Sequence, residues 1–266
     1  MSTIAARIDA VQERIAAAAR RAGRAPEEVR LVGVTKTQPP EAVAEAIAAG
    51  LRDLGENRVQ EAEPKIAALS AAPPDVRWHL IGHLQSNKAR RAAALFDLIH
   101  SVDSPHLAAA LDRHVVGTRK DEGGTMNVSG AQIRPSSFTF HPLPVLLQVN
   151  VSGEATKEGF GLAGWEQRPD LLGAFFGQVE QILALPRLEV HGLMTIAPWG
   201  DDPAAARPVF RSLRRLRDEL ARRFPSAGWA ALSMGMTDDF EVAIEEGATL
   251  VRVGRAIFGE REPIKR

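Results

Sequence analysis

The sequence predicts an α/β fold: a single-domain (β/α)8 TIM barrel with an amphipathic helix at its N-terminal end. Eight short apolar runs alternate with helical patterns, and strands separated by helices pair in parallel through right-handed crossovers. Eight strands also close such a barrel, and the 266 residues of the chain are near its usual length. Polar residues that can carry chemistry follow strands along the whole chain, which favours the barrel over an open doubly wound sheet.

The apolar runs place the strands at residues 30–35, 51–54, 77–81, 97–102, 144–151, 188–193, 230–233 and 249–253. Helical patterns place the helices at residues 40–49, 57–69, 86–95, 105–114, 165–184, 204–223 and 238–246. Capping residues mark several of these boundaries. Asp103 and Ser104 precede Pro105, as at a helix start, whereas Gly50 and Gly247 lie where helices should end.

The N-terminal segment has the pattern of a helix that packs on the body of the protein. Apolar residues recur at helical spacing at Ile4, Ile8, Val11, Ile15 and Ala18. Charged residues interrupt every apolar run in this segment, so it is neither a signal peptide nor a transmembrane span. Its acidic residues also argue against a cleaved organellar presequence.

One segment breaks the alternation of strands and helices. Residues 115–142 are rich in Gly, Ser, Thr and Pro and have little helical periodicity. We predict that they form a flexible insertion within one domain that spans residues 1–266, and not a boundary between domains.

Composition excludes several classes of function. Lys plus Arg and Asp plus Glu both number 33, so the net charge of zero gives no argument for nucleic acid or membrane as a partner. The absence of cysteine excludes disulfides and thiol chemistry and suits the cytoplasm. The seven histidines lack metal-ligand spacing, so no metal site is expected. The arginine-rich run 211–223 keeps its leucines on one side, as in a helix with a solvated face.

Lys36 ends the first strand, in the stretch LVGVTKTQPP, where an ammonium group is costly to bury unless it is paired or neutralised. At the mouth of a barrel such a lysine can form a Schiff base with an aldehyde, because desolvation favours its neutral, nucleophilic form. The alternative is a structural lysine that is paired with Glu56 or Asp103.

The last two strands end in residues that can bind an anion. Gly235 and Gly254 leave room for backbone N–H groups to approach a ligand, and Arg255 follows directly. The final loops of such barrels often bind phosphate, although glycines after strands can also serve only as turn formers. A lysine opposite a phosphate site matches the needs of pyridoxal 5′-phosphate.

Six segments resemble, in order, the pyridoxal phosphate homeostasis proteins, the single-domain relatives of the alanine racemase barrel. They are VTKTQP, GENRVQEAEPK, WHLIGHLQSNK, LLQVNVSGEATKEGF, HGLMTIAP and LSMGMTDDFEVAIEEGATLVRVGRAIFG. The resemblance covers residues 27–259, and only the segment 115–142 is longer than the connection usual in the family. It implies a Schiff base on Lys36, and it implies further cofactor contacts from Asn57, Met194, Ser233, Arg252, Gly254 and Arg255.

Within this resemblance, Ser233, Gly254 and Arg255 would hold the phosphate, and Arg252 would face the pyridine nitrogen. A guanidinium only donates hydrogen bonds, so it leaves that nitrogen unprotonated and makes the ring a poorer electron sink. Racemisation remains possible in such a site, whereas transamination and decarboxylation are disfavoured. The alternative for Arg252 is a salt bridge with Glu245 or Glu246.

The resemblance implies a protein that supplies or buffers pyridoxal phosphate without established turnover. We expect a monomer in the cytoplasm, with apo-enzymes as possible recipients. An amino-acid racemase is the alternative, but racemisation needs a second base and the chain has no tyrosine. His79, His83 and His191 lie near strand ends and could replace it, although a lone histidine there is more often a hydrogen-bonded wall residue. A cofactor-free Schiff-base lyase is the third possibility.

Overall fold

The computed structural model of the protein describes residues 2–115 and 141–259, so most of the predicted insertion, residues 116–140, lies outside the described residues. Eight parallel strands of the described chain form the barrel. They are β1 (Arg30–Val34), β2 (Asp53–Glu56), β3 (Arg77–Leu80), β4 (Leu98–Val102), β5 (Leu143–Asn150), β7 (Leu188–Met194), β8 (Ala231–Ser233) and β9 (Leu250–Val253). These positions confirm the eight predicted strands, and only β2 lies about two residues further along than expected.

The barrel is closed. Strand β9 pairs with β1, and β4 pairs with β5 through Ile99 opposite Val145 and Val102 opposite Leu147. This second pairing joins the two edges that an open sheet would leave free, so the doubly wound alternative is wrong. An additional two-residue strand, β6 (Phe160–Gly161), which the sequence pattern did not predict, pairs with the end of β5.

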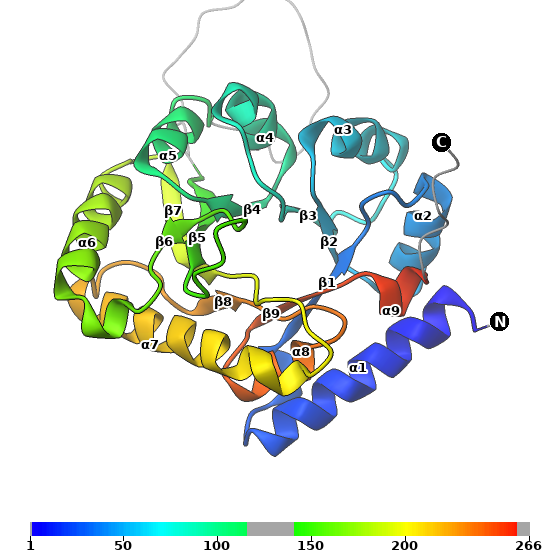
Figure 1. Ribbon diagram of the computed structural model, residues 1–266. Helices are drawn as coiled ribbons and strands as arrows, with labels where there is room; N and C mark the ends of the chain where they lie inside the picture. Colours follow the sequence, from blue (N-terminus) through cyan, green and yellow to red (C-terminus); the bar gives the residue numbers. More distant parts are fainter. Residues whose placement is uncertain (1, 116–140, 260–266) are drawn as a thin grey trace, which may run out of the picture.

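Helices surround the strands, as Figure 1 shows. They are α1 (Ile4–Arg21), α2 (Pro40–Ala48), α3 (Val59–Ala68), α4 (Ala89–Leu95), α5 (Pro105–Asp112), α6 (Pro169–Leu183), α7 (Arg207–Arg223), α8 (Phe240–Glu245) and α9 (Arg255–Phe258). Short 3-10 turns precede α4, α6 and α7 at Ser86–Lys88, Trp165–Gln167 and Pro203–Ala206, and a further one lies at Pro26–Glu28. Within the described parts of the chain, no helix is both long and apolar enough to cross a membrane.

The predicted caps are present. Ser104 Oγ accepts a hydrogen bond of 3.2 Å from the Leu107 N–H at the start of α5, which satisfies a backbone donor that the helix cannot. Gly50 and Gly247 follow α2 and α8 with φ of 95° and 102°, a conformation that side chains with a Cβ rarely adopt.

Helix α1 packs against α2, α8 and α9 on the outside of the barrel (Figure 1). Its predicted apolar face is buried, including Ile4, Ile8, Val11 and Ile15. Burial of each such side chain contributes about 1.5–3 kcal/mol. Two ion pairs of 3.0 Å, Arg14–Glu241 and Arg21–Glu245, join the polar edge of α1 to α8.

The arginines of α7 differ in part from the prediction of a solvated face. Leu213, Leu216 and Leu220 are buried, as expected. However, the nearly buried carboxylate of Glu246, just after α8, accepts hydrogen bonds from Arg207 at 3.1 Å and from Arg211 at 2.9 Å. Part of the arginine run therefore joins α7 to α8 instead of facing only water.

Candidate functional site

A cavity of about 310 Å³ opens at the C-terminal ends of the strands, where barrels of this kind carry their sites. Its wall includes Lys36, Asn57, His83, Gln148, Lys157 and Arg252. These residues come from the ends of β1, β2, β3 and β5, from the loop between β5 and β6, and from β9. The volume is at the lower end of the range for small-molecule sites.

Lys36 lies in a tight turn directly after β1. The Gln38 N–H donates to the Thr35 carbonyl at 3.0 Å, and Thr37 between them has φ of 65°. Among the described residues, Thr37 is the only one other than glycine with a positive φ, a strain of roughly 1–3 kcal/mol. Such strain persists only where surrounding contacts hold the chain, so the turn places Lys36 in a defined position.

A buried ion pair supports this turn. Lys65 Nζ lies 2.5 Å from Glu56 Oε1 and donates to the Thr35 carbonyl at 2.7 Å. The Thr35 hydroxyl donates to the same Glu56 oxygen at 2.6 Å. All three residues are buried. Their contacts join the end of β1 to β2 and α3 and hold it in place. Glu56 therefore already has a lysine partner, and Asp103, the other carboxylate considered for Lys36, contacts His83 at 3.3 Å.

Arg252 places a positive charge inside the barrel. Its side chain is buried, and it donates to Ser233 Oγ at 2.7 Å and to the Thr195 carbonyl at 3.0 Å. Burial lowers the pKa of Arg252 to about 10, which still leaves it protonated at neutral pH, and the nearby Asp239 carboxylate opposes that shift. The alternative of a salt bridge with Glu245 or Glu246 is wrong, because those carboxylates bind arginines of α1 and α7.

The cavity brings together three of the seven cofactor-binding residues predicted from the sequence, namely Lys36, Asn57 and Arg252. Met194 lies beneath it, in an apolar layer inside the barrel with Val32, Leu146 and Leu250.

The other three predicted residues were those expected at the phosphate. Ser233 is fully buried, and its hydroxyl contacts Arg252 and His100. Gly254 lies at the start of α9, and the exposed Arg255 forms an ion pair with Asp238.

Gln148, which is 5% exposed, was not among the residues predicted from the sequence. Its Nε2 donates to the Glu158 carbonyl at 3.0 Å, while its Oε1 is buried with no hydrogen-bond partner among the described residues. An unpaired buried acceptor costs about 1–3 kcal/mol. Since Gln148 lines the cavity, a bound molecule that donates a hydrogen bond would remove this cost. The available signal was a polar residue inside the apolar run VLLQV.

Only one of the three candidate histidines reaches the cavity. His83 lines it and lies 3.3 Å from Asp103, whose pKa is raised by burial. His79 is buried below, with hydrogen bonds to Asp53 and His100 of 2.9 Å each. His191 lies 3.1 Å from Glu189, away from this cavity.

Three side chains at the rim of the cavity could hold a cation. Ligand atoms of His83, Asp103 and Glu158 lie within 4.8 Å of one another. They come from three separate loops, which is why no local spacing predicted them. Exposed carboxylates often gather in this way without an ion, and we assign none to the cluster.

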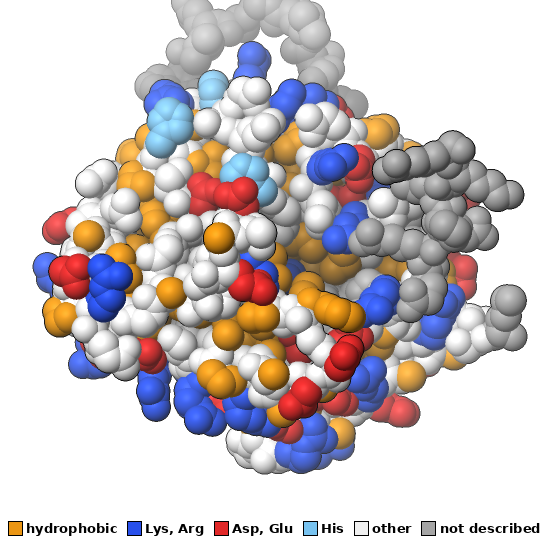
Figure 2. All heavy atoms as spheres, viewed as in Figure 1, with side chains coloured by type: hydrophobic (Ala, Val, Ile, Leu, Met, Phe, Trp, Pro, Cys, Tyr) orange, Lys and Arg blue, Asp and Glu red, His pale blue; other side chains and the backbone are white. Residues whose placement is uncertain are grey.

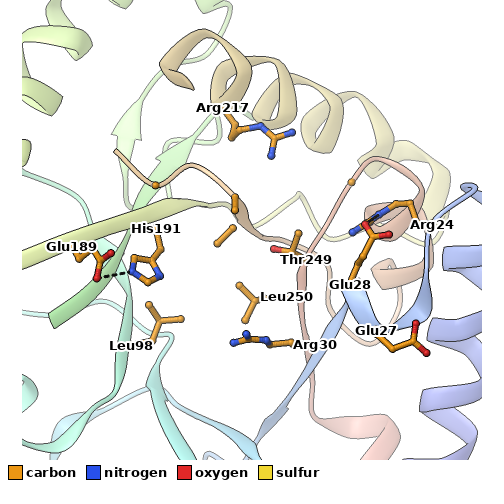
Figure 3. A pocket seen from close by; sticks show the side chains of 14 residues that line it. Arg24, Glu27, Glu28, Arg30, Leu98, Glu189, His191, Arg217, Thr249 and Leu250 are labelled. Carbon is orange, nitrogen blue, oxygen red and sulfur yellow. Dashed lines mark hydrogen bonds and ion pairs between the residues drawn. The ribbon is translucent and has the colours of Figure 1, made fainter. Parts of the chain in front are cut away.

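A larger cavity of about 810 Å³ lies at the other end of the barrel, where the strands begin (Figure 3). Arg30, Glu189, His191, Arg217 and Thr249 surround it, with charges of both signs. Size alone does not make it the site, because residues at this end of a barrel mainly serve stability. On the face of the molecule that Figure 2 shows, Lys and Arg side chains are intermingled with Asp and Glu, and neither sign of charge forms a patch.

Comparison with known proteins gives consistent matches over the whole chain. The family model described as alanine racemase, N-terminal domain, matches residues 7–262. A pyridoxal phosphate homeostasis protein of Pseudomonas aeruginosa is 44% identical over 262 residues, covering 98% of this chain and 97% of that protein. One of Aquifex aeolicus is 41% identical over 256 residues, covering 96% and 97%. The structure of PipY from Synechococcus elongatus PCC7942 with PLP bound is 36% identical, with a TM-score of 0.73, and the match covers 97% of this chain and 100% of PipY.

The fold and the lysine at the mouth of the barrel define a protein of the alanine racemase N-terminal-domain class. Within that class, the chain belongs to the family of pyridoxal phosphate homeostasis proteins.

Proposed function

We propose that this protein binds pyridoxal 5′-phosphate as a Schiff base on Lys36 and buffers the supply of this cofactor in the cytoplasm as a monomer. The observation that carries the proposal is that Lys36 and the buried cation Arg252 line the same cavity. The Lys36 amine and the aldehyde of the cofactor condense to an imine and release water.

The residues around the cavity fit this cofactor. Arg252 has only donors, so it can hydrogen-bond an unprotonated ring nitrogen and cannot protonate it at neutral pH. The unpaired Oε1 of Gln148 offers an acceptor to the bound molecule. PipY, which is similar over its whole length, has been solved with PLP bound.

The phosphate belongs, in this proposal, at the ends of β8 and β9. Gly254 lies at the start of α9, and Arg255 supplies a positive charge beside it. Ser233 contributes less directly, because its buried hydroxyl already contacts Arg252 and His100.

The proposal includes no catalytic turnover. Racemisation needs an acid/base group on each side of the cofactor, and the chain has no tyrosine to supply the second one. His83 is the residue that could do so, since it lines the cavity and contacts Asp103. However, its side chain is 44% exposed, and a carbanion gains little stabilisation from groups in contact with water.

The test is the visible absorption of the purified protein after addition of pyridoxal phosphate. Lys36→Ala should lose the absorption of the imine, and Lys36→Arg should lose it as well because a guanidinium keeps the charge but forms no Schiff base. Lys157→Ala is the matched control on the same wall. Lys157 donates to the Ile196 carbonyl at 3.2 Å and pairs with Glu154 at 2.6 Å, so its amine already has two partners.

Both Lys36 variants should keep thermal stability within about 0.5 kcal/mol of the parent protein. An imine that survives in Lys36→Ala, or is lost only in Lys157→Ala, would assign the cofactor to another lysine. If the parent protein shows no imine absorption at saturating cofactor, the proposal is refuted and the cofactor-free Schiff-base lyase becomes the favoured alternative.

A further inference from the structure

Five polar side chains form a continuous hydrogen-bonded chain through the interior of the barrel. Asp53 Oδ1 contacts His79 Nε2 at 2.9 Å, and His79 Nδ1 contacts His100 Nε2 at 2.9 Å. His100 Nδ1 then contacts Ser233 Oγ at 2.8 Å, and Arg252 Nη1 donates to that oxygen at 2.7 Å. The contact between His100 on β4 and Ser233 on β8 crosses the barrel, because β5 and β7 separate these strands in the sheet.

The hydrogen-bonding capacity of each group determines the direction of the chain. Arg252 can only donate and the Asp53 carboxylate can only accept, so Ser233 Oγ accepts from Arg252 and, with both imidazoles neutral, gives its own proton to His100 Nδ1. A neutral imidazole that accepts at Nδ1 carries its proton on Nε2, so His100 donates to His79. By the same rule, His79 donates from Nε2 to Asp53.

This direction leaves every contact with one donor and one acceptor. It requires both imidazoles to be neutral and both to be protonated at Nε2. The five residues are at most 6% exposed, so an unmatched pair of donors or acceptors would be costly here. Burial, together with the positive charge of Arg252, holds the pKa of His100 well below its usual range, in agreement with a neutral ring.

The two ends of the hydrogen-bonded chain, Asp53 and Arg252, carry opposite charges. Asp53 receives a second hydrogen bond of 2.9 Å from Arg77, and its pKa is below the usual range because the contacts with His79 and Arg77 outweigh the effect of burial. At the other end, Arg252 faces the cavity, with Asp239 as the nearby carboxylate. The chain cannot conduct protons into the cavity, because a guanidinium has no acceptor through which to receive one.

We propose that Asp53, His79, His100 and Ser233 form a hydrogen-bonded chain of fixed direction whose function is to hold Arg252 in position for the ring nitrogen of the cofactor, with His100 as the central positioning residue. The part of this inference that concerns the ring nitrogen rests on the proposed function. The direction of the chain does not, because it follows from the protein alone.

The direction can be tested on the cofactor-free protein. Long-range 1H–15N spectra of protein labelled at histidine distinguish protonated from unprotonated ring nitrogens. At neutral pH, we expect His79 and His100 each to show a protonated Nε2 and an unprotonated Nδ1, with assignments from His79→Gln and His100→Asn. A protonated Nδ1 on His100, or a doubly protonated ring at neutral pH, would overturn the chain.

The positioning role can be tested on the loaded protein through the pH at which the imine loses its proton, read from the visible absorption. A cation held near the ring disfavours the protonated imine, so freeing Arg252 should raise this pH. We expect His100→Leu to raise it by roughly half a unit or more. His100→Asn retains an acceptor near the position of Nδ1 and should stay close to the parent value.

Ser101→Ala is the matched control for these variants. Ser101 is the neighbour of His100 on β4, is also fully buried, and has a hydroxyl without a hydrogen-bond partner in the described part of the chain. The control should leave the titration unchanged. A parent-like titration in His100→Leu would show that His100 does not position Arg252. If the parent protein forms no imine, the proposed function is refuted. The hydrogen-bonded chain is not refuted by that result, because the spectra of the cofactor-free protein test its direction separately.

Discussion

Ser233 and Arg255 were predicted to serve the same phosphate, but their surroundings give them different roles. Ser233 is fully buried and joins Arg252 to His100, whereas Arg255 is exposed beside Asp238. The first residue therefore contributes to the fold and, in the proposed site, would act on the cofactor only through Arg252. The second can contribute only at the surface.

This difference predicts separable effects of the two substitutions. Ser233→Ala leaves buried groups unpaired and should lower the free energy of unfolding by about 1–3 kcal/mol. Arg255→Ala should leave stability within about 0.5 kcal/mol but weaken cofactor retention. Urea denaturation and equilibrium dialysis measure the two quantities. Unchanged retention in Arg255→Ala would mean that the phosphate lies elsewhere.

His100 should make stability depend on pH. Its pKa is depressed in the folded protein, mainly by burial, so the unfolded chain binds a proton below about pH 6.5 that the folded chain does not bind. The contribution of His100 to the free energy of unfolding is therefore fully present above that pH. It falls as the pH is lowered, by at most about 1.4 kcal/mol per pH unit. Urea denaturation between about pH 7.5 and 5.5 should show this slope in the parent protein and a smaller one in His100→Asn. Equal slopes would mean that His100 is protonated in the folded state.

At the scale of elements, the contact between β7 and β8 depends on one glycine. The pairing of β5 with β7 shifts register so that Val190 lies opposite Val145 and Gly192 opposite Leu146, which leaves His191 unpaired as in a bulge. Gly192 has φ of 152°, and a Cβ built on it would lie 1.9 Å from the Ala231 carbonyl oxygen. The backbone of β8 occupies the space that any side chain would need.

Gly192→Ala should therefore destabilise the protein by more than about 3 kcal/mol or prevent folding, since β8 would have to move. Gly173→Ala is the matched control. Gly173 is an exposed residue of α6, and among the described residues no atom beyond its chain neighbours and its own helix backbone lies within 4 Å of the position that its Cβ would occupy. Alanine there should therefore stabilise the helix by about 0.5–1 kcal/mol. Thermal unfolding of both variants measures the difference, and a Gly192→Ala protein as stable as the parent would contradict the observed register.

Element boundaries differed most from the sequence prediction where polar residues are buried. The strand expected at 51–54 is found at Asp53–Glu56. Asp53 and Glu56 are both buried, and each has a polar partner on another element. Asp53 contacts His79, and Glu56 contacts Lys65. Hydrophobic periodicity cannot identify such residues, since it assumes that polar side chains face water.

At the scale of the whole molecule, the proposed carrier role predicts how bound amino acids behave. Small amines should displace Lys36 from the cofactor by exchange at the imine, whereas loss of the α-proton should stay near background because His83 is half exposed. Holo-protein incubated with L-alanine in deuterated buffer reports both events, through the visible absorption and the α-proton signal. Rapid loss of that proton with formation of D-alanine, absent in Lys36→Ala, would instead support a racemase.

The sequence by itself determined the number and order of the barrel strands, the N-terminal helix and the position of Lys36 at the end of β1. These features depend on local periodicity, caps and turns, which act over a few residues. Only the tertiary structure decided the closure through β4 and β5, the burial of Ser233 and Met194 below the cavity, and the chain from Asp53 to Arg252. The physical reason is that these contacts join strands far apart in the chain, so the register of the whole barrel decides which side chains meet.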